Sequence, residues 1–451
     1  MPFLRGLSVR RLRQLATGAA ASVLFSVLMT NALRIVSSMT LTRLLDSHAY
    51  GVVGVITSIA YMLAMLTDIG LLGFIVRHDE GDDPHFLDQV WTIRLIRGIG
   101  LTILMILVAK PGAALLGKPE LAPVVAVWSV SFMLDGLSSL SFATAVRNKQ
   151  LWRLAMQELL ANVATLIVSI VTALLWHTYW ALIAGMITGQ VAKAILSYLL
   201  FPGMIRRIHI SPTCSAELWR FSRFIAMSSV LSLLILQSDK LVLARLMPLS
   251  AYGLYAIAVT LAAAPGAIAA PYATRVLYPT YSKAVREAPD TLPRLFYRAR
   301  RKVVLLYMFG VGGLLGGAQL IVSLLYDPRY HDVAYFLQWI AISTCLRIGS
   351  NAANEVLIAI GQMRATFFAN VCRVVWLVIG GVIGLATGKI MLLVAIVGTV
   401  EVPGMLCYWV FLYRQNLLNL REEGYGLAAG ACGAGLGLLV STAALSLFPH
   451  L

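Results

Sequence analysis

Residues 41–51 have the sequence LTRLLDSHAYG, and residues 243–253, which follow 202 positions later, have the sequence LARLMPLSAYG. Six of these eleven positions are identical. In membrane proteins, weak internal symmetry of this kind is typical of transporters, whose substrate site lies between the two copies. The repeat therefore predicts a membrane bundle that was built twice and that transports a substrate.

The composition places the chain in a lipid bilayer. Of its 451 residues, 59% are hydrophobic and 12% are charged, and the mean hydropathy is +0.82, whereas soluble domains carry about 25% charged residues. A helix of about 20 apolar residues crosses the hydrocarbon core. Thirteen such runs occur, at residues 19–41, 51–76, 90–109, 121–143, 155–176, 180–201, 224–246, 252–279, 303–325, 333–360, 366–387, 390–412 and 426–448. We expect an all-α polytopic membrane protein.

The distribution of charge predicts the orientation. Most of the 36 Lys and Arg residues lie on one side of the membrane if the amino terminus is cytoplasmic, which is the side that retains basic loops. The net charge of +16 then reflects topology and contact with membrane lipid, and no soluble domain is present to bind nucleic acid. The five cysteines are scattered without metal-ligand spacing, so neither a metal site nor another cofactor is expected.

Six predicted helices separate the two copies of the motif, so both copies face the same way. This arrangement predicts parallel repeats: residues 1–215 form one six-helix bundle, residues 216–413 form a second, and residues 414–451 add a C-terminal transmembrane helix. A central cleft between the bundles is the expected substrate site. The added helix is rich in glycine, which suits close packing on its neighbours, although it is also compatible with a peripheral position.

Charged residues inside the predicted helices identify the candidate site. Each costs roughly 2.5–3.5 kcal/mol at the centre of a bilayer, so these residues must face a wet cavity or one another. The candidates for binding an anionic substrate in the central cavity are Arg34, Lys240, Arg347, Arg373 and Asn31. The candidates for coupling or gating are Asp68, Asp135, Asp239 and Glu401. For each residue, the alternative is an ion pair or a hydrogen bond that only joins helices.

Two expectations concern the partners of these charges. Asp239 and Lys240 are consecutive, so they point about 100° apart around a helix and are not expected to neutralise each other. Asp135 and Arg347 are related by a weaker repeat with a spacing of 212 residues. They are expected to pair across the bundles and to act as a latch in one conformation.

Several motifs resemble those of bacterial polysaccharide flippases. The resemblance lies in residues 43–51, 68–71, 91–98, 239–246, 251–255 and 277–283, and it extends over residues 15–415. Their order and spacing are similar to those of the Wzx-like flippases, in the exopolysaccharide exporter branch of the multidrug/oligosaccharidyl-lipid/polysaccharide superfamily. The resemblance implies the MATE-like flippase fold.

It also implies a function. Members of the family move undecaprenyl-diphosphate-linked oligosaccharide units to the periplasmic leaflet of the bacterial inner membrane, for exopolysaccharide, O-antigen or capsule biosynthesis. The implied partners are a polymerase, a chain-length regulator and the glycosyltransferases of one pathway. The oligomeric state stays open.

Three other functions remain possible at this stage. Two are transport functions: a cation-coupled multidrug antiporter on the same fold, and a lipid II flippase. The third is a membrane glycan polymerase, which needs a sizeable outer loop, whereas no predicted outer loop exceeds about a dozen residues. The sequence has no glycine-rich phosphate loop and no nucleophile–base arrangement, so we do not expect an enzyme.

Overall fold

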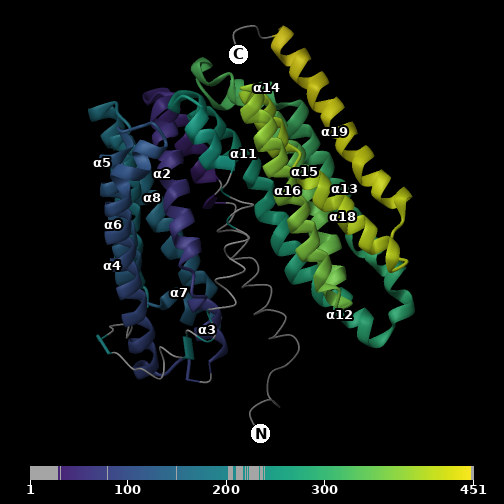
Figure 1. The fold of residues 1–451 in the computed structure, drawn as a ribbon, viewed down its shortest axis with the longest axis horizontal. Coiled ribbons are helices and arrows are strands. Elements are labelled where there is room, and N and C mark those ends of the chain that lie inside the picture. Colours follow the sequence, from purple (N-terminus) through teal and green to yellow (C-terminus); the bar gives the residue numbers. More distant parts are fainter. Residues whose placement is uncertain are drawn as a thin grey trace. The chain divides into compact units, whose positions relative to one another are not determined.

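The computed structural model describes residues 29–30, 32–78, 80–148, 150–201, 207–209, 217–218, 220, 222, 233, 237 and 239–447. Within these residues the regular structure is helical and contains no strand, which confirms the all-α prediction (Figure 1). Residues 32–44 and 239–246 are helical. The other helices up to residue 199 are α2 (Ser47–Leu66), α3 (Leu71–Arg77), α4 (Pro84–Leu115), α5 (Leu121–Trp128), α6 (Val130–Leu137), α7 (Ser141–Arg147), α8 (Leu151–Trp176) and α9 (Trp180–Leu199).

The second half of the chain is also helical. Its α-helices are α11 (Leu249–Tyr272), α12 (Tyr278–Glu287), α13 (Leu292–Gly316), α14 (Ala318–Leu325), α15 (Val333–Ala359), α16 (Met363–Thr387), α17 (Ile390–Gly398), α18 (Glu401–Arg414) and α19 (Leu420–Leu447). A π-helical segment (Ala273–Leu277) joins α11 to α12, and two 3-10 turns (Pro289–Thr291 and Pro328–Tyr330) precede α13 and α15.

Most of the described helices coincide with predicted apolar runs, but the run 51–76 is divided into α2 and α3, and the runs 121–143 and 303–325 contain bends of 45° and 70°. Eight described helices are long and apolar enough to cross a membrane, and the number rises to ten if each of two bent helix pairs is one span. Helix α15 coincides with the predicted run 333–360. The runs 19–41 and 224–246 lie partly outside the described residues, and the predicted bundle boundary after residue 215 lies outside them altogether. The total of thirteen spans stays a prediction.

The chain forms two compact units. The N-terminal unit contains residues 1–45 and 55–233, and the C-terminal unit contains residues 46–54 and 234–451. The first turns of α2 are therefore part of the C-terminal unit, although the rest of this helix is part of the other.

The two copies of the repeated motif contact each other within the C-terminal unit. The side chain of Asp46 accepts a hydrogen bond from the Ala49 backbone N–H at 3.0 Å and starts α2, whereas Pro248 precedes α11. A Cβ at Gly51 would collide with the carbonyl oxygen of Leu249, and a Cβ at Gly253 would collide with the carbonyl oxygen of Ser47. Each glycine thus lies against the residue four positions before the other glycine. Only glycine allows backbones to approach so closely.

Alanine at Gly51 or at Gly253 is expected to destabilise the protein by about 1–3 kcal/mol, because the added methyl group would force the two helices apart. Thermal unfolding in detergent measures this change. Gly266→Ala, in the same helix α11, is the control, since its Cβ would meet nothing within 4 Å. It should keep or slightly raise the melting temperature. Equal effects at all three glycines would contradict the close crossing.

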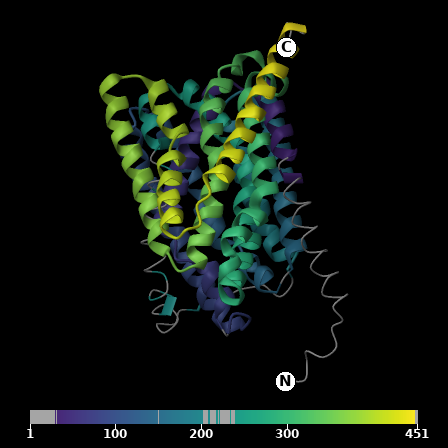
Figure 2. The same ribbon diagram turned by 90° about the vertical axis from the view of Figure 1, so that its right-hand side faces the viewer.

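The C-terminal helix α19 packs along α13 (Figures 1 and 2). Cβ atoms at Gly312 and Gly316 of α13 would collide with the backbone of α19, and those at Gly433 and Gly437 of α19 would collide with the backbone of α13. A Cβ at Gly435 would meet nothing within 4 Å, so this glycine takes no part in the contact. The added helix is therefore closely packed on α13, as its glycines suggested.

Candidate functional site

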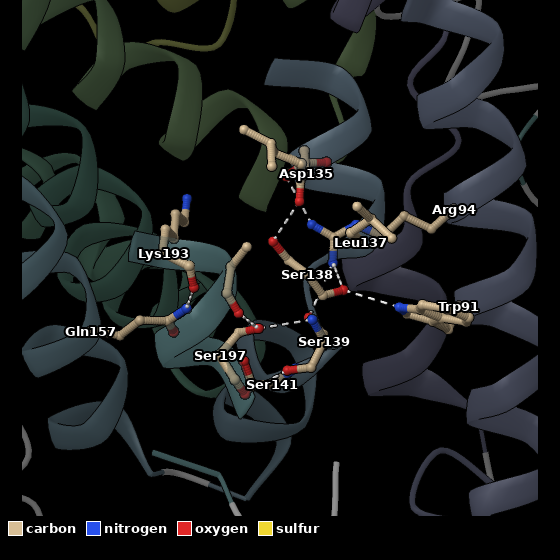
Figure 3. A network of polar contacts seen from close by, with 12 residues as sticks. Trp91, Arg94, Asp135, Leu137, Ser138, Ser139, Ser141, Gln157, Lys193 and Ser197 are labelled. Atoms are coloured by element: carbon tan, nitrogen blue, oxygen red, sulfur yellow. Dashed lines mark hydrogen bonds and ion pairs between the residues drawn. The ribbon is translucent and has the colours of Figure 1, made fainter. Parts of the chain in front are cut away.

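In the N-terminal unit, polar groups gather where a helix is broken. The α5–α6 segment and α7 meet at an angle of 45°, and Ser138 and Ser139 lie in the break. Arg94 Nη1 donates to the carbonyl oxygens of Ser138 at 3.4 Å and Ser139 at 3.1 Å, and Trp91 Nε1 donates to that of Ser138 at 3.2 Å (Figure 3). Non-helical backbone at membrane depth is tolerated only where it is buried in protein or lines a wet cavity. The side chains of α4 thus supply the missing hydrogen bonds.

Arg94 also pairs with a carboxylate. Its Nη2 lies 2.8 Å from Asp135 Oδ1, and its guanidinium stacks over the ring of Phe142 at 4.9 Å. The Arg94 side chain is 8% exposed, whereas that of Asp135 is 51% exposed. The carboxylate therefore keeps contact with solvent-accessible space while the guanidinium is buried.

A pocket of about 520 Å³ opens beside this ion pair. Its charged lining residues are Asp68, Arg94, Arg97, Asp135, Glu158 and Lys193. Arg97 Nη2 donates to the Ala64 carbonyl at 2.9 Å and to Thr67 Oγ1 at 3.1 Å. Asp68 Oδ1 accepts a hydrogen bond from the Gly70 N–H at 3.0 Å. The φ angle of Gly70 is 63°, a left-handed conformation that glycine adopts more easily than other residues. The pocket holds three cations and three acids, so it suits a polar ligand more than a strongly charged one.

In the C-terminal unit, Glu401 lies between two arginines. Its Oε2 is 2.8 Å from Arg373 Nη2, and its Oε1 is 3.5 Å from Arg347 Nε. Glu401 begins α18, directly after the break that follows α17, where the helix dipole favours an acid. Arg373 is 9% exposed and also donates to Asn370 Oδ1 at 2.8 Å. A Cβ at Gly404 would lie 2.5 Å from Arg373 Nε, so this glycine provides the space that the guanidinium occupies.

Lys240 and Arg347 line one pocket of about 150 Å³ together with Asp239. Tyr255 donates its hydroxyl to Asp239 Oδ2 at 2.7 Å, and Lys240 Nζ lies 3.6 Å from Asp239 Oδ1. The expectation that Asp239 and Lys240 stay apart is therefore wrong, because the long lysine side chain reaches back to its neighbour. The Arg347 side chain is 41% exposed, so its guanidinium is accessible to a ligand.

The structure places the remaining candidates as follows. Arg34 is exposed, and Asn31 lies outside the described residues. Asp135 pairs with Arg94 within the N-terminal unit, and Arg347 pairs with Glu401 within the C-terminal unit. The expected latch between Asp135 and Arg347 stays a prediction. Among the described residues, no group of three His, Cys, Asp or Glu side chains is arranged to hold a metal ion.

The sequence interpretation missed Arg94, Arg97 and Tyr255. The two arginines were not among the candidates, although their spacing of three residues places them on one face of α4. Tyr255 lies two residues after the second copy of the repeated motif, and its polar hydroxyl within an apolar helix was the available signal.

Comparison with known proteins identifies the family. Residues 40–335, about two thirds of the chain, match the family model described as polysaccharide biosynthesis protein. The chain belongs to this polysaccharide biosynthesis protein family. The resemblance deduced from the motifs is thereby confirmed.

Curated relatives agree with this family. The lipopolysaccharide biosynthesis protein WzxC of Escherichia coli (strain K12) is 25% identical over 422 residues, which cover 90% of this chain and 83% of WzxC. The succinoglycan biosynthesis transport protein ExoT of Rhizobium meliloti (strain 1021) is 25% identical over 300 residues, which cover 65% of this chain and 59% of ExoT. This member of the family is a multi-pass membrane protein.

Solved structures establish the fold. The lipid II flippase MurJ in an inward closed conformation matches with a TM-score of 0.72 over 94% of this chain and 92% of MurJ, at 12% identity. An inward-facing multidrug resistance MATE family transporter matches with a TM-score of 0.65 over 88% of this chain and 95% of the transporter, at 16% identity. At these identities the similarity shows the fold alone, which is the fold that MurJ and the MATE transporter share.

Proposed function

We propose that this protein is a flippase of the bacterial inner membrane, with its amino terminus in the cytoplasm, and that it moves undecaprenyl-diphosphate-linked oligosaccharide units to the periplasmic leaflet. The observation that carries the proposal is the pocket of the C-terminal unit, which the cations Lys240 and Arg347 of two apolar helices line together. Because cationic side chains at membrane depth are energetically costly, they usually mark a functional site. A diphosphate is a ligand of complementary charge.

The polar pocket of the N-terminal unit supports the same function. A sugar hydroxyl that enters hydrocarbon without a hydrogen-bond partner costs roughly 4–8 kcal/mol, so an oligosaccharide needs a wet and polar path. Arg97, Lys193, Asp68 and Glu158 line a pocket that offers donors and acceptors of both signs. The isoprenoid tail would stay in the bilayer while alternating access between the two repeats carries the headgroup across.

The names of the two relatives support the same function, since they refer to lipopolysaccharide biosynthesis and to succinoglycan biosynthesis transport. After transfer, a polymerase and a chain-length regulator would act on the units in the periplasmic leaflet. The transport step itself requires no catalytic residue of this chain.

Deletion of the chain in its host, followed by complementation, tests the proposal. We expect the deletion to raise the amount of diphosphate-linked oligosaccharide in lipid extracts by at least about 10-fold and to lower surface polysaccharide. Wild type should restore both, whereas Lys240→Ala and Arg347→Ala should not, because a lost charge-assisted hydrogen bond to a phosphate costs about 1.5–3 kcal/mol, which is a 10- to 100-fold effect. Lys389→Ala removes an exposed lysine outside the pocket and should complement fully.

Three outcomes would favour the other functions. Normal surface polysaccharide with new sensitivity to cationic drugs would indicate an antiporter, for which the buried acids Asp239 and Glu401 would bind the coupling cation. Accumulation of lipid II would indicate the peptidoglycan precursor as the substrate. Accumulation of flipped but unpolymerised units would indicate a polymerase.

A further inference from the structure

A further polar cavity, of about 970 Å³, lies at the N-terminal end of α13. Four basic residues of α13 line it, together with Arg421 from the start of α19: Arg294, Arg298, Arg301 and Lys302. Its lining includes one acid, Glu422, whose Oε2 lies 3.6 Å from Arg301 Nε. The cavity is therefore strongly basic, unlike the nearly neutral pocket of the N-terminal unit.

The cations of this basic cavity share one face of α13. Arg294, Arg298 and Lys302 are spaced four residues apart, so their side chains are neighbours on the helix surface. All three are exposed, and within the part of the chain that the structure describes none of them has a carboxylate partner. Like charges at this spacing repel one another. An anionic ligand from outside the chain would reduce this repulsion.

Apolar side chains stand beside the cations. Tyr413 at the end of α18 is 73% exposed, and Leu420 at the start of α19 is 64% exposed. The predicted apolar run 303–325 begins directly after Lys302. Basic clusters next to a transmembrane helix lie at the level of lipid headgroups, where tyrosine is also enriched. A molecule with an anionic head and an apolar chain would match both features.

We propose that the basic cavity binds an anionic phospholipid of the surrounding bilayer. The guanidinium groups of Arg294 and Arg298 hold the phosphate oxygens, for which arginine offers paired donors, and Lys302 adds a third charge. The acyl chains lie against Tyr413 and Leu420. Because the cavity is built from α13 and from the connection between α18 and α19, the bound lipid joins the C-terminal helix to the rest of its unit. The proposal does not depend on the transported substrate.

Native mass spectrometry of the full-length, delipidated protein tests the proposal. The protein is mixed with equal amounts of dioleoyl phosphatidylglycerol and dioleoyl phosphatidylcholine in detergent, and the bound lipid is counted. We expect wild type to retain phosphatidylglycerol at least about 10-fold better. The triple variant Arg294→Gln/Arg298→Gln/Lys302→Gln should lose this preference. The control Lys283→Gln/Arg286→Gln/Arg364→Gln removes the same charge from exposed positions outside the cavity, and it should keep the preference.

Equal binding of the two lipids by wild type, or an equal loss of the phosphatidylglycerol preference in both triple variants, would overturn the proposal. Displacement of the lipid by 10 mM inorganic phosphate would also overturn it, because it would indicate a site for free anions. Circular dichroism and size exclusion establish that each variant is folded. If the cavity triple variant fails to fold, the single change Arg298→Glu in the exposed position replaces it, and unchanged phosphatidylglycerol retention in that variant would equally refute the proposal.

Discussion

Replacing Arg94 with methionine is expected to lower the stability of the protein by about 1–3 kcal/mol, the cost of an unsatisfied buried acceptor, and to abolish complementation. The change leaves the Ser139 carbonyl oxygen without its Arg94 donor at the break between α6 and α7, and the Ser138 carbonyl oxygen with Trp91 Nε1 alone. An unsatisfied backbone carbonyl at membrane depth is unfavourable because no water is available to replace the bond. Equilibrium unfolding in mixed micelles measures the loss, and the host assay measures function.

Asp135→Asn is the matched control for Arg94. Its side chain is half exposed, and the arginine of this variant would still donate to both carbonyl oxygens. We expect a loss of at most about 1 kcal/mol, as for an exposed ion pair. If the asparagine variant were as unstable as the methionine variant, the ion pair, and not the support of the broken helix, would be the role of Arg94.

The second large effect is expected at Glu401. Glu401→Gln leaves the buried guanidinium of Arg373 without its carboxylate, and the loss of one partner of a buried pair costs about 3–5 kcal/mol. The start of α18 would also lose an acid that its helix dipole favours. Thermal unfolding in detergent should show a decrease of several degrees or more.

Arg347→Gln provides the contrast for Glu401. This arginine contacts the same carboxylate at 3.5 Å but is 41% exposed, so its removal should change stability by at most about 1 kcal/mol. Its loss should instead impair transport, as proposed above. Equal destabilisation by the two variants would show that Arg347 is structural, and it would remove this residue from the proposed substrate site.

The sequence predicts the positions of the helices better than the contacts between their side chains. An apolar run consists of consecutive residues, so it can be read directly from the sequence, and α8, α9 and α16 lie close to the predicted runs. Glu401 was also predicted as an embedded charge, because its cost in lipid can be read from the sequence. The partner of such a charge depends on which helices are neighbours and on how far a side chain reaches, and neither is local.

Arg94 and Lys240 illustrate this limit. Arg94 was overlooked because a basic residue near a helix end is usually a topological signal, whereas here it reaches a break in α6 and α7, more than 40 residues later. Lys240 was expected to point away from Asp239, which holds for the Cβ directions but not for the flexible end of the lysine. Arg34 and Asn31, as binding residues, stay predictions.

The crossing of α2 and α11 has the property of an interface between identical subunits. Gly51 meets Leu249, and Gly253 meets Ser47, so the residues equivalent by duplication exchange roles across a local two-fold relation. A segment of this kind is complementary to its own copy. Duplication of such a segment within one chain therefore supplies both contacting surfaces, and no different partner surface is needed.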